Sequence, residues 1–331
     1  MTDDPISRPR RRCLAALAGG ALLGGFRLSR ADDIAAGALV SRPIPSTGER
    51  LPVIGLGTYR SFDIGLTESE TAPVREVLRR FVDGGGRLID SSPMYGRSEA
   101  TIGRLAGELG VGGRLFHATK VWTRGREAGI AQMERSFARM GVERMDLMQV
   151  HNLLDTDVHL DTLRGWKREG RVRYLGVTHY HAGAHAELAA ELGRGGIDFV
   201  QLNFSLAEPE AERRLLPLAA DLGIAVIVNR PFAKGALFRA VRDRPLPPWA
   251  ADYGATSWAQ LFLKFILGHP AVTCAIPATG NPKHLVDNLW AGRSPLPDPD
   301  GRRRIASAIR FGKLLASLFA RLVWGKFTDT A

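Results

Sequence analysis

The sequence contains only two cysteines in 331 residues, Cys13 and Cys274, and it has no long apolar runs. Two cysteines cannot build a disulfide-dense secreted scaffold or a four-cysteine zinc site. No apolar run reaches the roughly 18 residues that a membrane-spanning helix needs. Low-complexity stretches and internal repeats are also missing. With 45% hydrophobic residues, the composition is that of a folded globular protein rather than a disordered chain.

Acidic residues are scarce at both ends of the chain, and most of the net charge of +11 lies there. Segment 1–31 carries +4 and segment 301–331 carries +6, so residues 32–300 carry only +1. A protein that binds nucleic acid needs basic residues over the surface that contacts it. The nearly neutral body therefore argues against nucleic acid as a partner.

The basic N-terminal segment, residues 1–31, has the pattern of a targeting signal. Arg10 and Arg11 precede a weakly apolar stretch over residues 13–26, and small residues follow where a signal peptidase cuts. The pattern resembles a twin-arginine export signal, although Cys13 stands where that pattern prefers Phe.

This resemblance implies that the export machinery is a partner of the full chain. The mature protein would begin near Asp32 and would be periplasmic or otherwise exported. A disordered basic tail is one alternative. An uncleaved anchor is disfavoured, because roughly 14 apolar residues are too few to span a bilayer.

Beyond residue 32, short apolar runs alternate with amphipathic stretches. Val74, Val77, Leu78 and Phe81 show the helical spacing i, i+3, i+4, i+7. Helices are expected over 72–83, 125–140, 160–169, 182–192, 209–222 and 257–267. Strands are expected over 53–57, 87–91, 115–120, 145–151, 172–178, 199–203, 224–229 and 272–277.

Strands that read as continuous apolar runs and alternate with helices predict a parallel sheet covered on both faces. Eight such units in about 270 residues indicate an α/β fold, a single-domain (β/α)8 TIM barrel over residues 32–300. The alternative is a doubly wound sheet. It is disfavoured because Gly55, Gly57 and Thr58 after the first strand do not form a G-x-G-x-x-G motif that opens a helix.

Polar residues stand at the ends of three predicted strands and just after one of them: Asp90, Tyr95, Lys120 and His151. In a barrel, residues at the carboxyl ends of strands line the active site. A lysine beside a tyrosine favours the phenolate, an aspartate keeps that lysine charged, and an imidazole positions a carbonyl oxygen. Together they make a proton donor for a carbonyl that takes up hydride. Taken singly, each has an ordinary reading as a turn cap, a core histidine or a packed loop aromatic.

The segments that carry these residues resemble the aldo-keto reductase family. The similarity runs from about residue 44 to residue 288 and includes "IDSSPMYGRSEATIG", "TKVW", "DLMQVHN" and "IPATGNPKHLVDN". It implies that Asp90, Tyr95, Lys120 and His151 form the family's catalytic tetrad, with Tyr95 as general acid. It also implies an aldehyde or ketone as substrate and NAD(P)H bound across the barrel mouth.

At the nicotinamide end of that cofactor, the resemblance implies contacts from Thr178, His179 and Gln201, where His179 replaces the family's usual Asn. Asn229 replaces the tyrosine that usually stacks on the ring, which leaves the manner of holding the ring open. Arg230 and Phe232 lie near Asn229 in the same stretch, and Gly57 and Thr58 are also expected to bind the cofactor.

At the adenosine end, the resemblance implies Thr279, Asn281, Lys283, His284 and Asn288, at a helix start that suits a phosphate. The family's frequent lysine after "IP" is replaced by alanine and its arginine by His284. Lys283 can still meet a 2′-phosphate, so NADP(H) is favoured and NAD(H) is the alternative.

Substrate choice is expected to depend on the loops that follow the strands. Tyr59, Phe62 and Trp122, with Phe232, would wall an apolar pocket. Ordinary loop packing is the alternative for each.

The basic C-terminal segment, residues 301–331, is expected to form an amphipathic helix with an apolar stripe over 311–322. One interpretation is peripheral contact with an anionic membrane surface or with a partner protein. The other is a terminal helix packed on the barrel.

Three alternatives to a reductase remain. A metal-dependent barrel hydrolase would use His151, His179 and His181 as zinc ligands, although no carboxylate accompanies them and no metal is expected. A Schiff-base enzyme would use Lys120. An exported nucleotide-binding or redox-sensing module would keep one bound nucleotide and turn over little.

Overall fold

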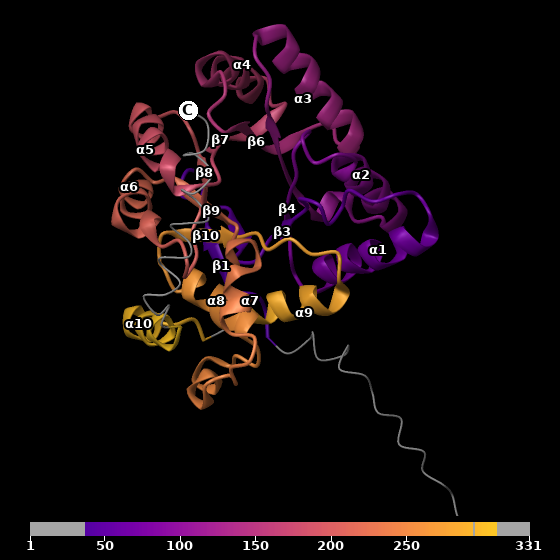
Figure 1. Cartoon of the computed structure of the whole chain (residues 1–331). Helices are drawn as coiled ribbons and strands as arrows, with labels where there is room; N and C mark the ends of the chain where they lie inside the picture. Colours follow the sequence, from indigo (N-terminus) through magenta and orange to yellow (C-terminus); the bar gives the residue numbers. More distant parts are fainter. Residues whose placement is uncertain (1–36, 294, 310–331) are drawn as a thin grey trace, which may run out of the picture. The chain divides into compact units, whose positions relative to one another are not determined.

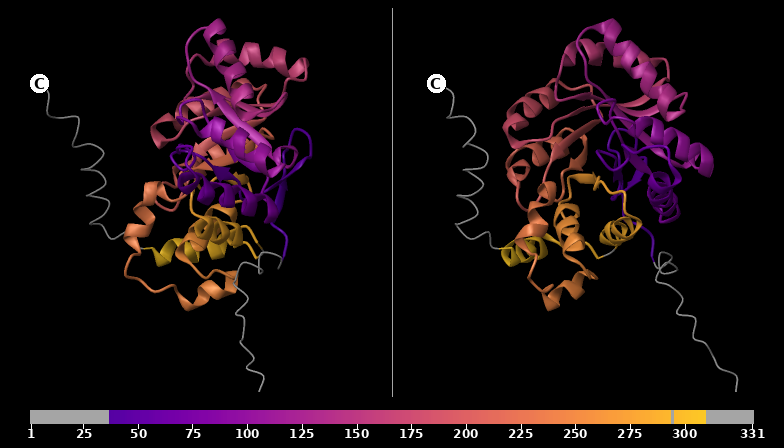
Figure 2. Two further views of the ribbon diagram at one scale, coloured as in Figure 1. Left: turned by 90° about the vertical axis from the view of Figure 1, so that its right-hand side faces the viewer. Right: turned by 45° about the vertical axis from the view of Figure 1, so that its right-hand side comes forward.

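The computed structural model describes residues 37–293 and 295–309, which form a barrel of strands surrounded by helices (Figures 1 and 2). The expected signal segment, residues 1–31, and the expected C-terminal stripe, residues 311–322, lie outside the described residues.

Eight parallel strands form the barrel, and each pairs with the next along the chain. Two isolated parallel bridges, Ile54 with Ala275 and Gly57 with Ala278, join the first of these strands to the last. Because the sheet closes, the carboxyl ends of all the strands meet at one mouth, which confirms the predicted (β/α)8 TIM barrel. The strands are β3 (Leu56–Gly57), β4 (Leu88–Asp90), β5 (Phe116–Val121), β6 (Met145–His151), β7 (Val172–Thr178), β8 (Phe199–Asn203), β9 (Ala225–Asn229) and β10 (Val272–Ala275).

Helices cover the outside of the barrel, and Figure 1 shows α1 to α6 succeeding one another around the strands. The apolar residues that predicted the first helix, Val74, Val77, Leu78 and Phe81, are all buried against the sheet. The helices are α1 (Glu68–Asp83), α2 (Ser98–Leu109), α3 (Arg126–Met140), α4 (Thr156–Arg168), α5 (His185–Arg194), α6 (Leu215–Asp221), α7 (Ala236–Ala240), α8 (Trp258–Leu267), α9 (Pro282–Ala291) and α10 (Pro299–Ala308).

A second, smaller core fills the inside of the barrel. Phe116, Tyr174 and Phe199 meet there with ring centroids 5.5 to 6.1 Å apart. An antiparallel hairpin, β1 (Ser41–Pro43) with β2 (Arg50–Pro52), adds Ile44 and Leu51 to this cluster. The hairpin closes the amino-terminal end of the barrel, so only the opposite end is left open for chemistry.

Some elements differ from the expectation. The first helix begins at Glu68 rather than Ala72, because Thr67 and Glu70 form a capping box in which the Thr67 N–H donates to the Glu70 carboxylate at 3.3 Å. The helix expected over 209–222 is divided into a 3₁₀ turn, Glu210–Arg213, and α6. Helix α2 was not predicted.

The end expected for the barrel, residue 300, falls inside α10. Ile305 of that helix is fully buried in the main core, so the packing of the barrel continues at least to this residue. None of the helices in the described part of the chain is long and apolar enough to cross a membrane.

Candidate active site

The four residues expected to be catalytic lie together at the mouth of the barrel. Asp90 ends β4, Lys120 lies near the end of β5, His151 ends β6, and Tyr95 lies in the loop after β4. Lys120 Nζ lies 2.6 Å from Asp90 Oδ2 and 5.1 Å from the centroid of the Tyr95 ring. The rings of Tyr95 and His151 meet edge to face, with centroids 6.2 Å apart. The barrel therefore brings four residues from across 62 positions of sequence into one cluster.

The Lys120–Asp90 ion pair is buried and has further hydrogen bonds on both sides. Lys120 Nζ also donates to the carbonyl oxygen of Ser91 at 2.6 Å. The second carboxylate oxygen, Asp90 Oδ1, accepts from the side-chain amides of Gln149 at 3.1 Å and Gln201 at 2.9 Å. Burial acts to lower the pKa of Lys120, but the groups facing it, above all the Asp90 carboxylate, outweigh burial and raise that pKa. The ammonium therefore stays charged.

Tyr95 is half-buried next to this charge. Its ring packs against Tyr59 at a centroid distance of 5.0 Å. Burial raises the pKa of the Tyr95 phenol, and the Lys120 charge only partly opposes this effect. The phenol therefore keeps its proton at neutral pH, beside a cation that stabilises the phenolate once the proton has left.

His151 is a neutral imidazole in this setting. Burial, followed by the charges of Lys120 and His179, lowers the pKa of His151 to about 3. His151 Nδ1 lies 3.1 Å from Ser92 Oγ, and this contact fixes the orientation of the ring. With Nδ1 engaged, Nε2 is the ring nitrogen available to a ligand.

Two residues of this network were not predicted from the sequence: Gln149, which binds Asp90, and Ser92, which orients His151. The period of two in a strand was the available signal for Gln149, since it stands two positions before His151 and so points into the barrel as His151 does. Ser92 lies in a loop, where no periodicity indicates direction.

The residues expected at the nicotinamide end come from three adjacent strands. Thr178 and Gln201 are buried, and Asn229 Nδ2 donates to the His179 carbonyl at 3.0 Å and to Gln201 Oε1 at 3.3 Å. Asn229 Oδ1 is buried and has no hydrogen-bond partner among the described residues. An unpaired buried acceptor is costly unless a ligand supplies the donor, and a carboxamide N–H fits this need.

Gly57 and Thr58, also expected to contact the cofactor, have structural roles at the first strand. A Cβ on Gly57 would lie 2.7 Å from the carbonyl oxygen of Ile276, so glycine allows the barrel to close at this point. Thr58 is fully buried, and its hydroxyl donates to the carbonyl of Asp90 at 2.9 Å. This bond holds the turn that carries the Asp90 carboxylate.

A cavity of about 490 Å³ lies beside the end of β10 and the start of α9. Four residues expected to contact the cofactor line it: Phe232, Thr279, His284 and Asn288. Asn281 caps α9 by accepting the backbone N–H of Lys283 at 2.9 Å. The volume is typical of a small-molecule site, and the helix N-terminus adds a favourable end for a phosphate.

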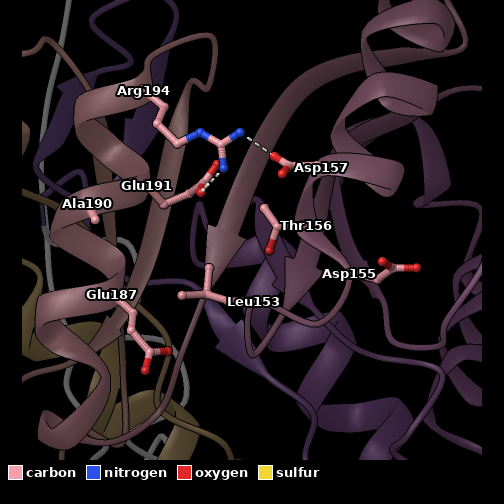
Figure 3. Close-up of a pocket in the computed structure, with 8 residues that line it drawn as sticks. All are labelled: Leu153, Asp155, Thr156, Asp157, Glu187, Ala190, Glu191 and Arg194. Atoms are coloured by element: carbon pink, nitrogen blue, oxygen red, sulfur yellow. Dashed lines mark hydrogen bonds and ion pairs between the residues drawn. The ribbon is translucent and has the colours of Figure 1, made fainter.

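A second hollow of about 440 Å³ lies between α4 and α5 (Figure 3). Arg194 faces Asp157 across it and also pairs with Glu191 at 3.2 Å. None of the expected site residues lines this hollow, so we assign it no part in the chemistry of the mouth.

Two of the three residues expected to contact substrate flank the tetrad. Tyr59 exposes 54% of its surface beside Tyr95, and the Trp122 ring lies 6.1 Å from that of His151. Phe62, the third, is fully buried in the main core. It packs beneath its loop and presents no surface to the mouth.

The geometry does not favour the two other enzymatic alternatives. The rings of His179 and His181 lie 4.3 Å apart, yet the described residues contain no group of three or more His, Cys, Asp or Glu side chains placed to hold a metal ion. Lys120 is fully buried, with a raised pKa and an ion-pair partner. A Schiff-base lysine needs the opposite, a readily lost proton.

Backbone strain is concentrated at the mouth. Within the described residues, every non-glycine residue with a positive φ lies in a loop after β3, β6 or β9. Left-handed backbone costs roughly 1–2 kcal/mol per residue, and such strain gathers at functional sites. The residues are Arg60, Asn152, Leu153, Asp155, Arg230, Ala233 and Lys234.

Comparison with known proteins identifies a family and relatives of this chain. The model of the Aldo/keto reductase family matches residues 53–305. An aldo-keto reductase of Mycobacterium sp. (strain JLS) is 25% identical over 249 residues, which covers 73% of this chain and 84% of the relative.

Solved structures share the fold. An aldo-keto reductase from Klebsiella pneumoniae in complex with NADPH superposes with a TM-score of 0.69 at 22% identity, covering 83% of this chain and 97% of that one. Another from the same organism, in complex with NADP and acetate, gives a TM-score of 0.68 at 23% identity, covering 80% and 94%.

Proposed function

The chain belongs to the aldo/keto reductase family, and from this we propose that it is an NAD(P)H-dependent oxidoreductase that reduces an aldehyde or ketone to an alcohol. The observation that carries the proposal is the buried Lys120–Asp90 pair beside the Tyr95 phenol, with the neutral imidazole of His151 at a centroid distance of 6.2 Å from the Tyr95 ring. This is the arrangement needed to protonate a carbonyl oxygen in a site that holds its charges fixed.

Each residue has a separate task in this proposal. NAD(P)H, when bound, supplies the hydride that the carbonyl carbon accepts. Tyr95 gives its proton to the carbonyl oxygen, and Lys120 stabilises the phenolate that remains. Asp90 keeps Lys120 charged and in place. His151 is hydrogen-bonded to Ser92 through Nδ1, and with Ser92 as the donor it would carry its proton on Nε2 and donate from there to the carbonyl oxygen.

The chain offers polar groups that could bind both ends of the cofactor. Thr178, Gln201 and Asn229 would bind the carboxamide, and Asn229 Oδ1 has the free acceptor for it. The cavity next to α9 would take the adenosine, with Lys283 at the helix start for a 2′-phosphate. We propose NADP(H) ahead of NAD(H). The Klebsiella pneumoniae structures with NADP and NADPH support this choice.

Replacement of Tyr95 by Phe tests the assignment of the general acid. Tyr95→Phe should lower kcat for aldehyde reduction by roughly 10²- to 10⁴-fold. NADPH affinity, measured by fluorescence quenching, should stay within a few-fold of wild type. Tyr174→Phe is the matched control, because it removes a hydroxyl at the closed end of the barrel and should leave kcat unchanged. Wild-type turnover in Tyr95→Phe would refute the proposal.

A second candidate is a nucleotide-binding or redox-sensing module with little turnover. It is favoured by the replacements at the nicotinamide end, where His179 and Asn229 stand in place of the family's asparagine and tyrosine. Product formation in a single turnover, compared with multiple turnovers under excess NADPH, separates the two. A burst of one equivalent with no further product would favour the module.

We also propose that residues 1–31 direct export by the twin-arginine route, which supports a periplasmic location. The arginine pair and the weakly apolar stretch that follows it support this. Expression of the full chain with Arg10→Lys and Arg11→Lys, followed by cell fractionation, tests it. Retention of the double variant in the cytoplasm is the expected result, and unchanged export would refute the proposal.

The basic segment 301–331 is proposed to make a peripheral contact with anionic membrane surfaces. Sedimentation of the full chain with anionic and with neutral vesicles tests this contact. Equal sedimentation with both would argue against it.

A further inference from the structure

Arg230 places a half-buried cation at the mouth of the barrel, in the loop that follows β9. No carboxylate among the described residues lies within ion-pair distance of its guanidinium. The guanidinium lies over the ring of Tyr180, 4.2 Å from its centroid. The direction of this side chain is therefore set by an aromatic face rather than by a counter-ion.

The backbone at Arg230 is strained. Its φ is +50°, in the left-handed region that arginine rarely adopts, and Ala233 and Lys234 in the same loop share this conformation. The Ala233 N–H donates a hydrogen bond of 2.9 Å to the carbonyl oxygen of Arg230, and this bond holds the turn. Strain of this kind persists only where the surroundings enforce it, and here it fixes a cation above the barrel.

The charge of Arg230 is incompletely compensated. Burial lowers the pKa of the guanidinium, and the nearby groups that oppose this effect without cancelling it are Glu208, Tyr180, Tyr59 and Tyr95. The Glu208 carboxylate already accepts from Asn203 Nδ2 at 2.8 Å. A half-buried cation whose charge is not balanced by its neighbours is stabilised by an anion that binds at the mouth.

The position of Arg230 points to the substrate rather than to the cofactor phosphates. Arg230 directly follows Asn229, whose amide donates to Gln201, and Gln201 in turn donates to Asp90 at the reaction centre. Tyr59 and Tyr95 are also among the groups that act on the pKa of Arg230. Arg230 is not among the residues that line the cavity next to α9, although Phe232, two residues later, is. In this loop, Phe232 therefore lies at the adenosine end of the site and Arg230 at the substrate end.

We propose that Arg230 binds a carboxylate of the carbonyl substrate, and hence that the preferred substrates are aldehydes or ketones that carry a carboxylate, such as oxo acids. This inference rests on the proposed reductase function. The planar guanidinium matches a carboxylate with two parallel hydrogen bonds, which a neutral carbonyl compound cannot form. It would therefore select among carbonyl compounds by charge.

A matched pair of aldehydes tests the inference: 4-carboxybenzaldehyde and its methyl ester, each with NADPH. Wild type should show the higher kcat/KM for the carboxylate. Arg230→Gln should lower the ratio of the two kcat/KM values by roughly 10- to 100-fold, and Arg230→Lys should retain part of it. The ratio is used because any loss common to both aldehydes cancels.

Arg60→Gln is the control variant. Arg60 is exposed, also has a positive φ, and lies 5.3 Å from the centroid of the Tyr59 ring on the loop after β3. The ratio should be unchanged in this variant. A loss of the ratio in Arg60→Gln but not in Arg230→Gln would overturn the assignment.

Two further outcomes would overturn it. One is a wild-type enzyme with no preference for the carboxylate. The other is an Arg230→Gln variant that keeps the ratio but binds NADPH at least tenfold more weakly by fluorescence quenching, which would assign Arg230 to a cofactor phosphate.

A binding measurement separates this inference from the proposed function. If neither aldehyde is reduced, the reductase proposal fails. Calorimetry with 4-(hydroxymethyl)benzoate and its methyl ester on NADP⁺-loaded protein still tests Arg230. Selective binding of the carboxylate, lost in Arg230→Gln, would support the anion site, and equal binding of both compounds would refute it.

Discussion

The ammonium of Lys120 lies 2.6 Å from the carboxylate of Asp90, and the two side chains expose 0% and 3% of their surface. Asp90 pairs in register with Ala118 of the next strand, so Lys120, two positions later, points to the same inner face. The free-energy cost of removing two charges from water offsets most of the free energy gained from their attraction. We therefore attribute the pair to the chemistry of Tyr95 rather than to the stability of the fold.

Breaking this pair should cost stability as well as activity. Lys120→Met leaves the Asp90 carboxylate buried without a cation, so the free energy of unfolding should fall by about 3–5 kcal/mol and aldehyde reduction should be lost. Urea denaturation measures the first effect. Lys167→Met is the control, because Lys167 lies at the same 2.6 Å from Asp198 but is 41% exposed. The free energy of unfolding of Lys167→Met should fall by no more than about 1 kcal/mol, and equal falls in the two variants would contradict the argument.

The stability of the protein should depend on pH through His151. Its pKa is about 3 in the folded chain, against about 6.5 when unfolded. Between these values the unfolded chain binds the extra proton, so lowering the pH from 6.5 toward 3 should destabilise the fold by up to about 1.4 kcal/mol per pH unit.

Denaturation at pH 7, 6 and 5 checks this, with His151→Gln as the comparison. His179, whose pKa is lowered to about 4, contributes in the same direction to both proteins, so the difference between them isolates His151. Parallel pH dependences in wild type and variant would show that His151 is not held neutral.

The strands and the meeting of Asp90, Tyr95, Lys120 and His151 at one mouth could be predicted from the sequence because their signals are local. Asp90 and His151 each end an apolar run, and a closed barrel brings the carboxyl ends of its strands to one mouth independently of the loop conformations. Phe62 could not be placed, since loops have no period that separates the core side from the mouth side. Arg230 was expected near the cofactor, and only the structure shows which groups its charge faces.

Helix α2 shows how packing overrides local preference. Gly103 and Gly107 lower its helical propensity, which explains why the sequence did not predict it. The structure gives a reason for one of them: a Cβ on Gly103 would lie 2.2 Å from the carbonyl oxygen of Arg139 in α3. The close approach of α3 therefore requires glycine at this position of α2.

The two glycines of α2 should therefore respond in opposite ways to alanine. Gly103→Ala should destabilise the protein by about 1–3 kcal/mol, because α3 must move away. Gly107→Ala, with nothing within 4 Å of the new Cβ, should stabilise it by about 0.5–1 kcal/mol. Thermal or urea unfolding of both variants measures the signs. The same sign in both would contradict the close packing of α2 and α3.

Cofactor preference should depend on Lys283. Lys283→Ala removes a cation at the start of α9, so NADPH should bind roughly tenfold more weakly while NADH affinity changes little, since only NADPH carries the 2′-phosphate. Fluorescence titration with each nucleotide gives the two constants. An equal effect on both would assign Lys283 to a different part of the nucleotide.

The joint between the first and last strands has a consequence for how readily a protease can attack the barrel. β3 has only two residues, and two isolated bridges, Ile54 with Ala275 and Gly57 with Ala278, join the chain around it to the chain around β10. A short joint of this kind opens earlier than the long strand pairs, and an opened joint is what a protease cleaves. Gly57 and Thr279, on either side of it, are both expected to face the cofactor. A nucleotide bound across both residues would hold the joint closed, so the cofactor should slow proteolysis of the purified protein.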